Sequence, residues 1–371
     1  MVYHFIKTDT KAKNDARLRR WIKTFNDDWK IKACVIAFVT NEQSWQEEFV
    51  EVRTKKIWFR KFFKIGKGRP FKIIETFLKL LPVILKSRPG TTFIYHDNQL
   101  YFVIMFHAML KKILRHRLVW DMHELPHNFL LEWPAFSYLL RYMLERFDYC
   151  IVANKYRGQY INERLNTEKE FKILNNYPTI VDLEKEKNLQ FDLGFNKKDT
   201  IALWIGSPSI KRNFIPFYEA CKNLGFKILV LGKISNESAF LETDKNCKIL
   251  FVKPETIPDY IDNISLSAVF YRNVNKNNWF CEPNRLYLLM SRGAKFIAGN
   301  NPQIKDTLKH YEYAKVLNSD APEYDKILKG VKELNDIKKP QNPVEYGRNF
   351  LKENNMVWEY QIDQLKKIFK V

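Results

Sequence analysis

Short apolar segments recur along the whole chain, and most of them are apolar at nearly every position. Such continuous runs are typical of strands that are covered on both faces of a parallel sheet. The intervals between them have helical character: Leu18, Trp21 and Phe25 share one helical face, and Gly225 is placed to end another helix. The predicted strands are residues 2–6, 32–39, 91–96, 117–123, 149–154 and 171–176, then 201–206, 226–232, 247–252, 266–272, 294–300 and 314–318.

The strands and helices alternate in two sets. This alternation predicts an α/β protein with two Rossmann-like, doubly wound domains. We expect the first domain at residues 1–180 and the second at 200–345, with a charged linker at 181–199 between them. Residues 346–371 are expected to form a C-terminal helix that packs back on the first domain. The apolar positions of that helix are Trp358, Ile362, Leu365 and Phe369.

The composition narrows the class of protein. The chain has 371 residues, of which 46% are hydrophobic and 28% charged, which suits two folded domains rather than disorder. The sequence does not open on a secretory signal, and its most apolar run, residues 101–110, is too short to span a bilayer. The five cysteines are scattered, without metal-ligand spacing. We therefore expect a cytoplasmic protein with free thiols.

The net charge of +20 favours an anionic partner. Residues 53–72 hold nine lysines or arginines, no acid and several large aromatic side chains. This mixture is typical of a surface that lies on anionic lipid. Two alternatives stay open: a solvated loop whose aromatic rings fold into the core and, less favoured, a site for single-stranded nucleic acid. The side chains expected to face the membrane are Lys55, Lys56, Trp58, Arg60, Lys61 and Phe62.

Several motifs of other chemistries are absent from the sequence. It contains no G-x-G-x-x-G after its first strand, no Walker phosphate loop and no G-x-S-x-G. It also lacks an Asp-x-Asp pair that would hold a divalent metal on a nucleotide diphosphate. A bound diphosphate would then be neutralised by helix N-termini, backbone amides and basic side chains, so we expect neither a metal nor another cofactor.

Polar side chains gather where the predicted strands end, which is where open parallel sheets bind ligands. Simpler explanations stay open: Asp97 and Asp121 can cap turns, His123 can be structural, and Asn284 can be a helix cap. The candidates in the first half are Asn14, Asp15, Arg17, Asp97, His123, Glu124 and Asn176. The candidates in the second half are Gly206, Ser207, Lys211, Arg212, Glu282, Asn284 and Arg285.

In order and spacing, these segments resemble glycosyltransferases of the GT-B fold. The resemblance covers nearly the whole chain and is nearest to the large family 4, whose members use nucleotide-sugar donors and include enzymes of bacterial cell-surface polysaccharide synthesis. The segments that carry it are "IYHDNQL", "VWDMHEL", "ALWIGSPSIKRNFIPFYEA" and "EPNRLYLLMSRGAKFIAG".

The resemblance implies a metal-independent transfer, with retention, from a nucleotide-diphosphate sugar to a hydroxyl acceptor. The second domain would hold the donor, with Lys211, Arg212 and Arg285 on the diphosphate. The first domain would hold the acceptor, with His123 near the sugar ring or the acceptor hydroxyl and Glu124 and Asp97 as further catalytic candidates. We expect a lipid-linked saccharide acceptor and a peripheral place on the inner face of the membrane.

Two departures from the family pattern keep other activities open. Ser207 stands where many members have arginine, and Leu288 stands where many have a glutamate that binds the ribose, which leaves Glu282 as the nearest carboxylate. A sugar-nucleotide epimerase of the same fold and a non-catalytic saccharide or nucleotide binder are therefore the alternatives.

Overall fold

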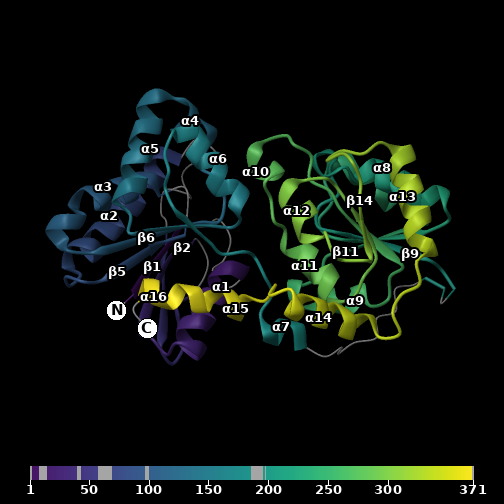
Figure 1. The fold of residues 1–371 in the computed structure, drawn as a ribbon, viewed down its shortest axis with the longest axis horizontal. Helices are drawn as coiled ribbons and strands as arrows, with labels where there is room; N and C mark the ends of the chain where they lie inside the picture. The colour runs from purple at the N-terminus through teal and green to yellow at the C-terminus, as the bar shows by residue number, and fades with distance from the viewer. Residues whose placement is uncertain are drawn as a thin grey trace. The chain divides into compact units, whose positions relative to one another are not determined.

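The computed structural model of the chain describes residues 2–7, 15–39, 43–56, 69–96, 100–184, 195–196 and 198–369. It divides the chain into two compact units, which we describe separately (Figure 1). The first unit comprises Met1–Asn175 together with Gln361–Val371, and the second comprises Asn176–Tyr360. The candidate residues outside the described ranges are Asn14, Trp58, Arg60, Lys61, Phe62 and Asp97.

The described part of the first unit contains an eight-stranded sheet in the order β3-β4-β2-β1-β5-β6-β7-β8. Every neighbouring pair is parallel except β3 with β4, and β1 pairs with β2 in the register Val2↔Ala33. The first six predicted strands are all present. The strands are β1 Val2–Lys7, β2 Ala33–Val39, β3 Trp45–Gln46, β4 Val50–Lys56, β5 Thr92–Tyr95, β6 Arg117–Met122, β7 Tyr149–Val152 and β8 Phe171–Ile173.

Strands β3 and β4 were not predicted, because β4 alternates apolar and charged residues near the edge of the sheet. Val50 and Val52 are buried, whereas Glu51 and Arg53 form an ion pair on the other face. The start of the basic segment 53–72 is therefore part of a strand, with Lys55 half-buried and Lys56 exposed at its end.

Helices cover both faces of the first sheet. Helices α2, α3, α5 and α6 contact one another in this order, and the usual right-handed crossovers would put α1 on the opposite face. Phe369 of α16 contacts the rings of Trp21, Phe25 and Trp29. The predicted face of α1 is confirmed, since Leu18, Trp21, Ile22 and Phe25 are all buried. The helical segments are α1 Ala16–Lys23, η2 Thr24–Asp28, α2 Arg69–Lys86, α3 Tyr101–Leu114, α4 Asn128–Glu132, α5 Pro134–Arg146, α6 Lys155–Leu165, η7 Asp363–Leu365 and α16 Lys366–Phe369.

The described part of the second unit contains a six-stranded, all-parallel sheet in the order β11-β10-β9-β12-β13-β14. Its strands are buried on both faces: on β9, Leu203 enters one core layer and Trp204 the other. This explains why the strands are continuous apolar runs. All six predicted strands are present. They are β9 Ile201–Ile205, β10 Lys227–Leu231, β11 Cys247–Leu250, β12 Leu266–Val269, β13 Phe296–Ala298 and β14 Ala314–Val316.

Helices also lie on both faces of the second sheet. Helices α8 and α13 pack together over one face, while α9, α11 and α14 contact one another over the other. Gly225, with φ +75°, follows the end of α8 as predicted. The helical segments are α7 Ile180–Glu184, η4 Ile210–Arg212, α8 Phe214–Asn223, η5 Asn236–Glu242, η6 Pro254–Thr256, α9 Ile257–Ile261, α10 Lys276–Trp279, α11 Asn284–Ser291, α12 Pro302–Thr307, α13 Tyr324–Asp336, α14 Pro343–Glu353 and α15 Trp358–Ile362.

Two glycines bring α11 and α14 into backbone contact. Gly293, with φ +59°, ends α11, and a Cβ added there would lie 2.0 Å from the Pro343 carbonyl oxygen. A Cβ on Gly347 would lie 2.1 Å from the Met290 carbonyl oxygen. Most of helix α14 falls in the segment 346–371 that was expected to return to the first domain, yet the helix packs in the second unit.

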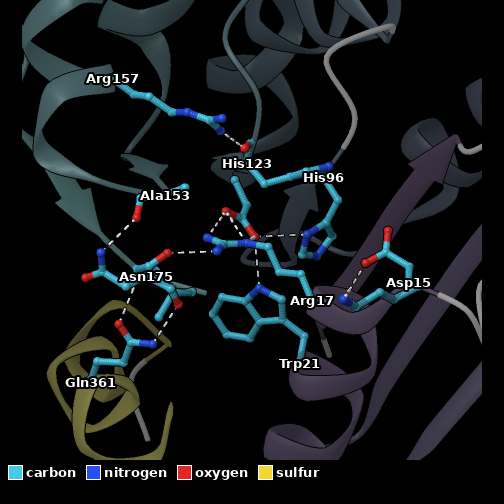
Figure 2. A network of polar contacts seen from close by, with 12 residues as sticks. Asp15, Arg17, Trp21, His96, His123, Ala153, Arg157, Asn175 and Gln361 are labelled. Atoms are coloured by element: carbon cyan, nitrogen blue, oxygen red, sulfur yellow. Dashed lines mark hydrogen bonds and ion pairs between the residues drawn. The ribbon is translucent and has the colours of Figure 1, made fainter. Parts of the chain in front are cut away.

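The return to the first unit begins at Gln361. Its side-chain oxygen accepts from the Asn175 amide at 2.8 Å, and its Nε2 donates to the Asn175 carbonyl at 2.8 Å (Figure 2). The predicted single helix is three short segments, α15, η7 and α16. Its predicted apolar positions, Trp358, Ile362, Leu365 and Phe369, are all buried.

Candidate functional site

A buried carboxylate organises the carboxyl end of the first sheet. Asp121, at the end of β6, has no exposed surface and accepts hydrogen bonds from Arg17 at 2.6–3.1 Å. Trp21 Nε1 donates to Asp121 Oδ2 at 2.9 Å, and His96 Nδ1 lies 3.1 Å from the same oxygen (Figure 2). Burial alone would raise the pKa of Asp121, but Arg17 and His96 hold it well below its usual range.

Arg17 is fully engaged within the protein. Besides its two nitrogens on Asp121, its Nη1 donates to the Leu174 carbonyl at 2.7 Å, and only 5% of the residue is exposed. It therefore joins α1 to the ends of β6 and β8. Its charge is neutralised by a buried partner, so Arg17 is a positioning residue in this structure rather than a free cation.

His123 lies one residue beyond β6 and next to this cluster. Its carbonyl accepts from Arg157 Nη1 (Figure 2), and its buried Nδ1 has no hydrogen-bond partner among the described residues. Burial lowers the pKa of His123 despite the opposing charges of Asp121 and Asp15. The ring is therefore neutral near pH 7, with one nitrogen that the described residues leave without a hydrogen bond.

The other first-half candidates have different surroundings. Glu124 is exposed beside His123. Asp15 caps α1, accepting from the Leu18 amide at 2.9 Å. Asn176 belongs to the second unit, where its side-chain amide donates to the Glu282 carbonyl at 3.2 Å. Of the described candidates, Asp15, Arg17, His123 and Glu124 are thus gathered at the carboxyl end of the first sheet.

A buried arginine occupies the switch point of the second sheet. Strand order reverses between β9 and β12, which is where open parallel sheets bind ligands. Arg285, in the first turn of α11, donates from Nη1 to the Ile205 carbonyl at 2.6 Å and from Nη2 to the Phe270 carbonyl at 3.2 Å. It therefore spans the carboxyl ends of these two strands.

A second arginine lies beside the first. Arg212 and Arg285 both lie over the Tyr271 ring, with 5.3 and 4.8 Å from guanidinium carbon to ring centroid. A Cβ added to Gly206, which has φ +96°, would lie 2.5 Å from Arg212 Nη1. Glycine therefore leaves the space that the Arg212 guanidinium occupies.

Neither arginine forms an ion pair with a described residue. Burial and, to a lesser degree, Arg212 lower the pKa of Arg285, yet an arginine remains protonated near neutral pH. Its Nε is buried and has no hydrogen-bond partner within the described part of the chain. Among the described residues, the positive charge at the switch point is stabilised by carbonyl groups and aromatic faces and by no carboxylate, an arrangement suited to an anion.

The remaining second-half candidates differ in exposure. Lys211 is exposed on η4, and Ser207 is half-buried. Asn284 is exposed as the first residue of α11, where Pro283, not Asn284, occupies the cap position.

Glu282 is directed into the protein. It is only 4% exposed, and one of its oxygens accepts a hydrogen bond from the Tyr287 hydroxyl. The Tyr287 ring in turn packs edge-on against the Tyr177 ring, with 5.1 Å between the ring centroids. Leu288, at the position of the family's glutamate, is half-buried. The carboxylate nearest to that position is therefore engaged with core tyrosines.

Four residues of this arrangement were not among the site candidates: Trp21, His96, Asp121 and Tyr271. His96 and Tyr271 lie at the carboxyl ends of predicted strands, which is the signal that marks a strand exit. Trp21 was assigned to the core from its helical spacing, and nothing in that spacing indicates its indole hydrogen bond. Among the described residues, no group of histidine, cysteine and carboxylate side chains is placed to hold a metal ion.

Comparisons with known proteins identify the fold. No known protein family matches the sequence, and no curated protein matches it either. Solved structures do match over the whole length of the chain. Sucrose-phosphate synthase from Thermosynechococcus elongatus has a TM-score of 0.72 and 10% identity, covering 100% of this chain and 98% of that one.

Two further structures support the same assignment. Anabaena HepE in complex with UDP has a TM-score of 0.67, 14% identity and full coverage of both chains. An α,α-trehalose-phosphate synthase (UDP-forming) from Burkholderia vietnamiensis has a TM-score of 0.67, 7% identity and coverage of 100% and 99%. The chain therefore has the GT-B fold of two Rossmann-like domains, as predicted.

Proposed function

We propose that this protein is a glycosyltransferase that moves a sugar from a nucleotide-diphosphate sugar to a hydroxyl acceptor. The observation that carries the proposal is the pair of uncompensated arginines, Arg212 and Arg285, at the switch point of the second sheet. Two similar structures support a nucleotide donor, since one is described as UDP-forming and another holds UDP.

In this proposal, the two guanidinium groups bind the diphosphate of the donor. Negative charge grows on the diphosphate as its bond to the sugar breaks, so fixed positive charge stabilises the transition state more than the ground state. We propose that Arg212 and Arg285, with Lys211 and the N-terminus of α11, supply this charge without a metal ion. Gly206 and Ser207 would line the same loop.

His123 is proposed to act on the sugar or on the acceptor hydroxyl. Its pKa is lowered by burial and its Nδ1 has no partner among the described residues, so it offers a neutral acceptor for a hydrogen bond. The buried cluster around Asp121 would fix the position of the β6 exit that carries it. Retention at the anomeric carbon is part of the proposal.

The acceptor is proposed to be a lipid-linked saccharide of surface polysaccharide assembly, used at the inner face of the membrane. The excess of basic residues in the first unit supports a place at an anionic surface. No helix in the described ranges is long and apolar enough to cross a bilayer.

Nucleotide binding tests the arginine site. Arg212→Gln is expected to weaken UDP binding by about 10- to 100-fold, the effect of losing one charge-assisted contact. The matched control is Lys222→Gln. Lys222 is also a cation of the second unit that lies 5.3 Å from a tyrosine ring centroid, that of Tyr218, as Arg212 does from Tyr271. Titration calorimetry that gives equal UDP affinities for the wild type and Arg212→Gln would contradict the site.

A second measurement separates a transferase from a binder or an epimerase. His123→Ala is expected to slow release of UDP from a UDP-sugar by about 10²- to 10⁴-fold while leaving UDP affinity unchanged. A non-catalytic binder would show no turnover in either form. An epimerase would convert the donor to an epimer without any acceptor.

A further inference from the structure

Helix α2 exposes an apolar row to solvent. Phe71, Ile74, Leu78 and Leu85 are 45–59% exposed, and their spacings of three, four and seven residues place them on one helical face. The buried side of the same helix contains Leu80 and Ile84 together with Glu75 and Thr76. Helix α2 is therefore apolar on its outer side as well as toward the core, whereas an ordinary surface helix is polar on its outer side.

Helix α3 repeats the pattern next to α2. Phe102, Met109 and Ile113 are 56–77% exposed. The two helices lie side by side, with the Phe77 and Phe106 rings in edge contact at 5.1 Å (Figure 1). We define the α2–α3 face as the seven exposed residues Phe71, Ile74, Leu78, Leu85, Phe102, Met109 and Ile113.

The charges on α2 and α3 are mostly positive. The basic residues with described side chains on these helices are Lys79, Lys86, Lys111 and Lys112, against one carboxylate, Glu75, which is buried and paired with Lys79. The basic end of β4 lies against α2, because Lys55 Nζ donates to the Lys79 carbonyl at 3.4 Å and Lys79 Nζ donates to the Lys56 carbonyl.

A basic pocket adjoins the last turn of α3. It has a volume of about 370 Å³ and is lined by Lys111, Lys112 and Arg146 together with Tyr142 and Glu145. Lys111 is paired with Asp148 at 2.8 Å, which leaves Lys112 and Arg146 as its less compensated cations. A pocket of this kind suits the phosphate of a lipid head group.

We infer that the α2–α3 face is the surface by which the protein lies on an anionic lipid bilayer. Its apolar side chains would enter the interface while the flanking lysines reach the head groups. A second copy of the chain is a poor occupant, because pairing two such faces would bring like charges together. Nucleic acid is also a poor occupant, since its phosphates would not bury the exposed aliphatic side chains. The inference names the surface that would give the membrane location in the proposed function. It rests on the proposed function only in linking that surface to a lipid-linked acceptor.

Vesicle sedimentation tests this inference. The wild type is expected to pellet with vesicles of equal parts phosphatidylcholine and phosphatidylglycerol, and much less with phosphatidylcholine alone. The double variant Ile74→Ser, Leu78→Ser is expected to lower the partition coefficient at least about tenfold, because two apolar side chains no longer enter the interface. The matched control is Phe251→Ser, which removes a large apolar side chain that is 86% exposed on the second unit. Both variants should keep the wild-type melting temperature, since all three side chains are exposed.

Three results would overturn the inference. They are a double variant that pellets like the wild type, a wild type that stays in the supernatant, and a wild-type dimer in analytical ultracentrifugation that the double variant dissociates. Vesicle binding needs no nucleotide, and the UDP titration of Arg212→Gln needs no vesicles. Failure of one proposal is therefore distinguishable from failure of the other.

Discussion

Buried and half-buried charged residues in this protein occur in two different settings, one with oppositely charged partners and one without them among the described residues. Asp121 gathers Arg17, Trp21 and His96 into a compensated buried cluster, which is costly to break because any partner left behind would be an unpaired buried group. Arg212 and Arg285 are instead like charges held against one ring. A bound anion would relieve their mutual repulsion, as the proposed function requires.

A buried pair of histidines makes stability depend on pH. His107 Nδ1 lies 2.6 Å from the Tyr95 hydroxyl, and His107 Nε2 lies 2.9 Å from His116 Nδ1. Burial and the neighbouring His116 lower the pKa of His107 to about 3, and burial lowers the pKa of His116. The unfolded chain then binds more protons, so this stability is present above about pH 6.5 and is lost as the pH falls below it.

We expect the free energy of unfolding to fall by at most about 1.4 kcal/mol per pH unit for each such histidine. His116→Gln should reduce this slope, whereas His310→Gln, at an exposed position, should leave it unchanged. Urea titrations at pH 7 and pH 5 give both slopes. An unchanged slope in His116→Gln would show that the pair does not control acid stability.

At the scale of single residues, the sequence indicated which residues lie at the ends of strands and helices better than it indicated which side chains they bind. Arg17, His123, Arg212 and Arg285 were recognised because they follow strands or open helices. The ion pair of Arg17 with Asp121 could not be predicted, because the two residues are 104 positions apart and come into contact only in the folded protein. Glu282 was expected near the ribose, but its contact with Tyr287 depends on the packing of α11.

Elements were predicted well where burial decides the pattern. All twelve predicted strands are present, because a strand covered on both faces must be apolar throughout. Strand β4 was missed because one of its faces is charged, and α2 did not stand out because it has apolar side chains on its outer side as well as on its buried side. Hydrophobic periodicity therefore predicts an element poorly when its outer face is charged on a strand or apolar on a helix.

The contact between α11 and α14 predicts an unequal response to glycine substitution. Gly293→Ala is expected to destabilise the second unit by more than the roughly 1–2 kcal/mol of a left-handed backbone alone, because the new Cβ overlaps the Pro343 carbonyl. Gly90→Ala is the control, since Gly90 also has positive φ but has nothing within 4 Å of the added Cβ. Chemical denaturation that gives equal losses for both would contradict a close helix contact.

For the molecule as a whole, the first unit is assembled from two distant parts of the sequence. Gln361 pairs with the Asn175 backbone, and Phe369 inserts among Trp21, Phe25 and Trp29. The aromatic spacing near the C-terminus predicted the buried face. It did not predict that the return would begin as late as Gln361, because the packing of α14 depends on the contact of Gly347 with the Met290 carbonyl.

Removing the Phe369 ring should loosen the first unit selectively. Phe369→Ala is expected to cost about 3–5 kcal/mol, as for other buried phenylalanines. Hydrogen exchange should then rise at α1 and η2 and stay unchanged in β9 and β12. Tyr360→Ala is the control, because Tyr360 is 43% exposed. Equal protection of α1 in Phe369→Ala and in the wild type would show that the C-terminal helix does not support it.

The split composition of the first unit has a consequence for biosynthesis. The second unit is a continuous stretch, Asn176–Tyr360, and all of it has been translated before Phe369 is added. Until residue 369 has been translated, the Trp21, Phe25 and Trp29 rings lack one of their packing partners. The first unit is therefore begun before the second unit and completed after it, and the nascent chain carries these three rings with incomplete packing while the second unit is translated.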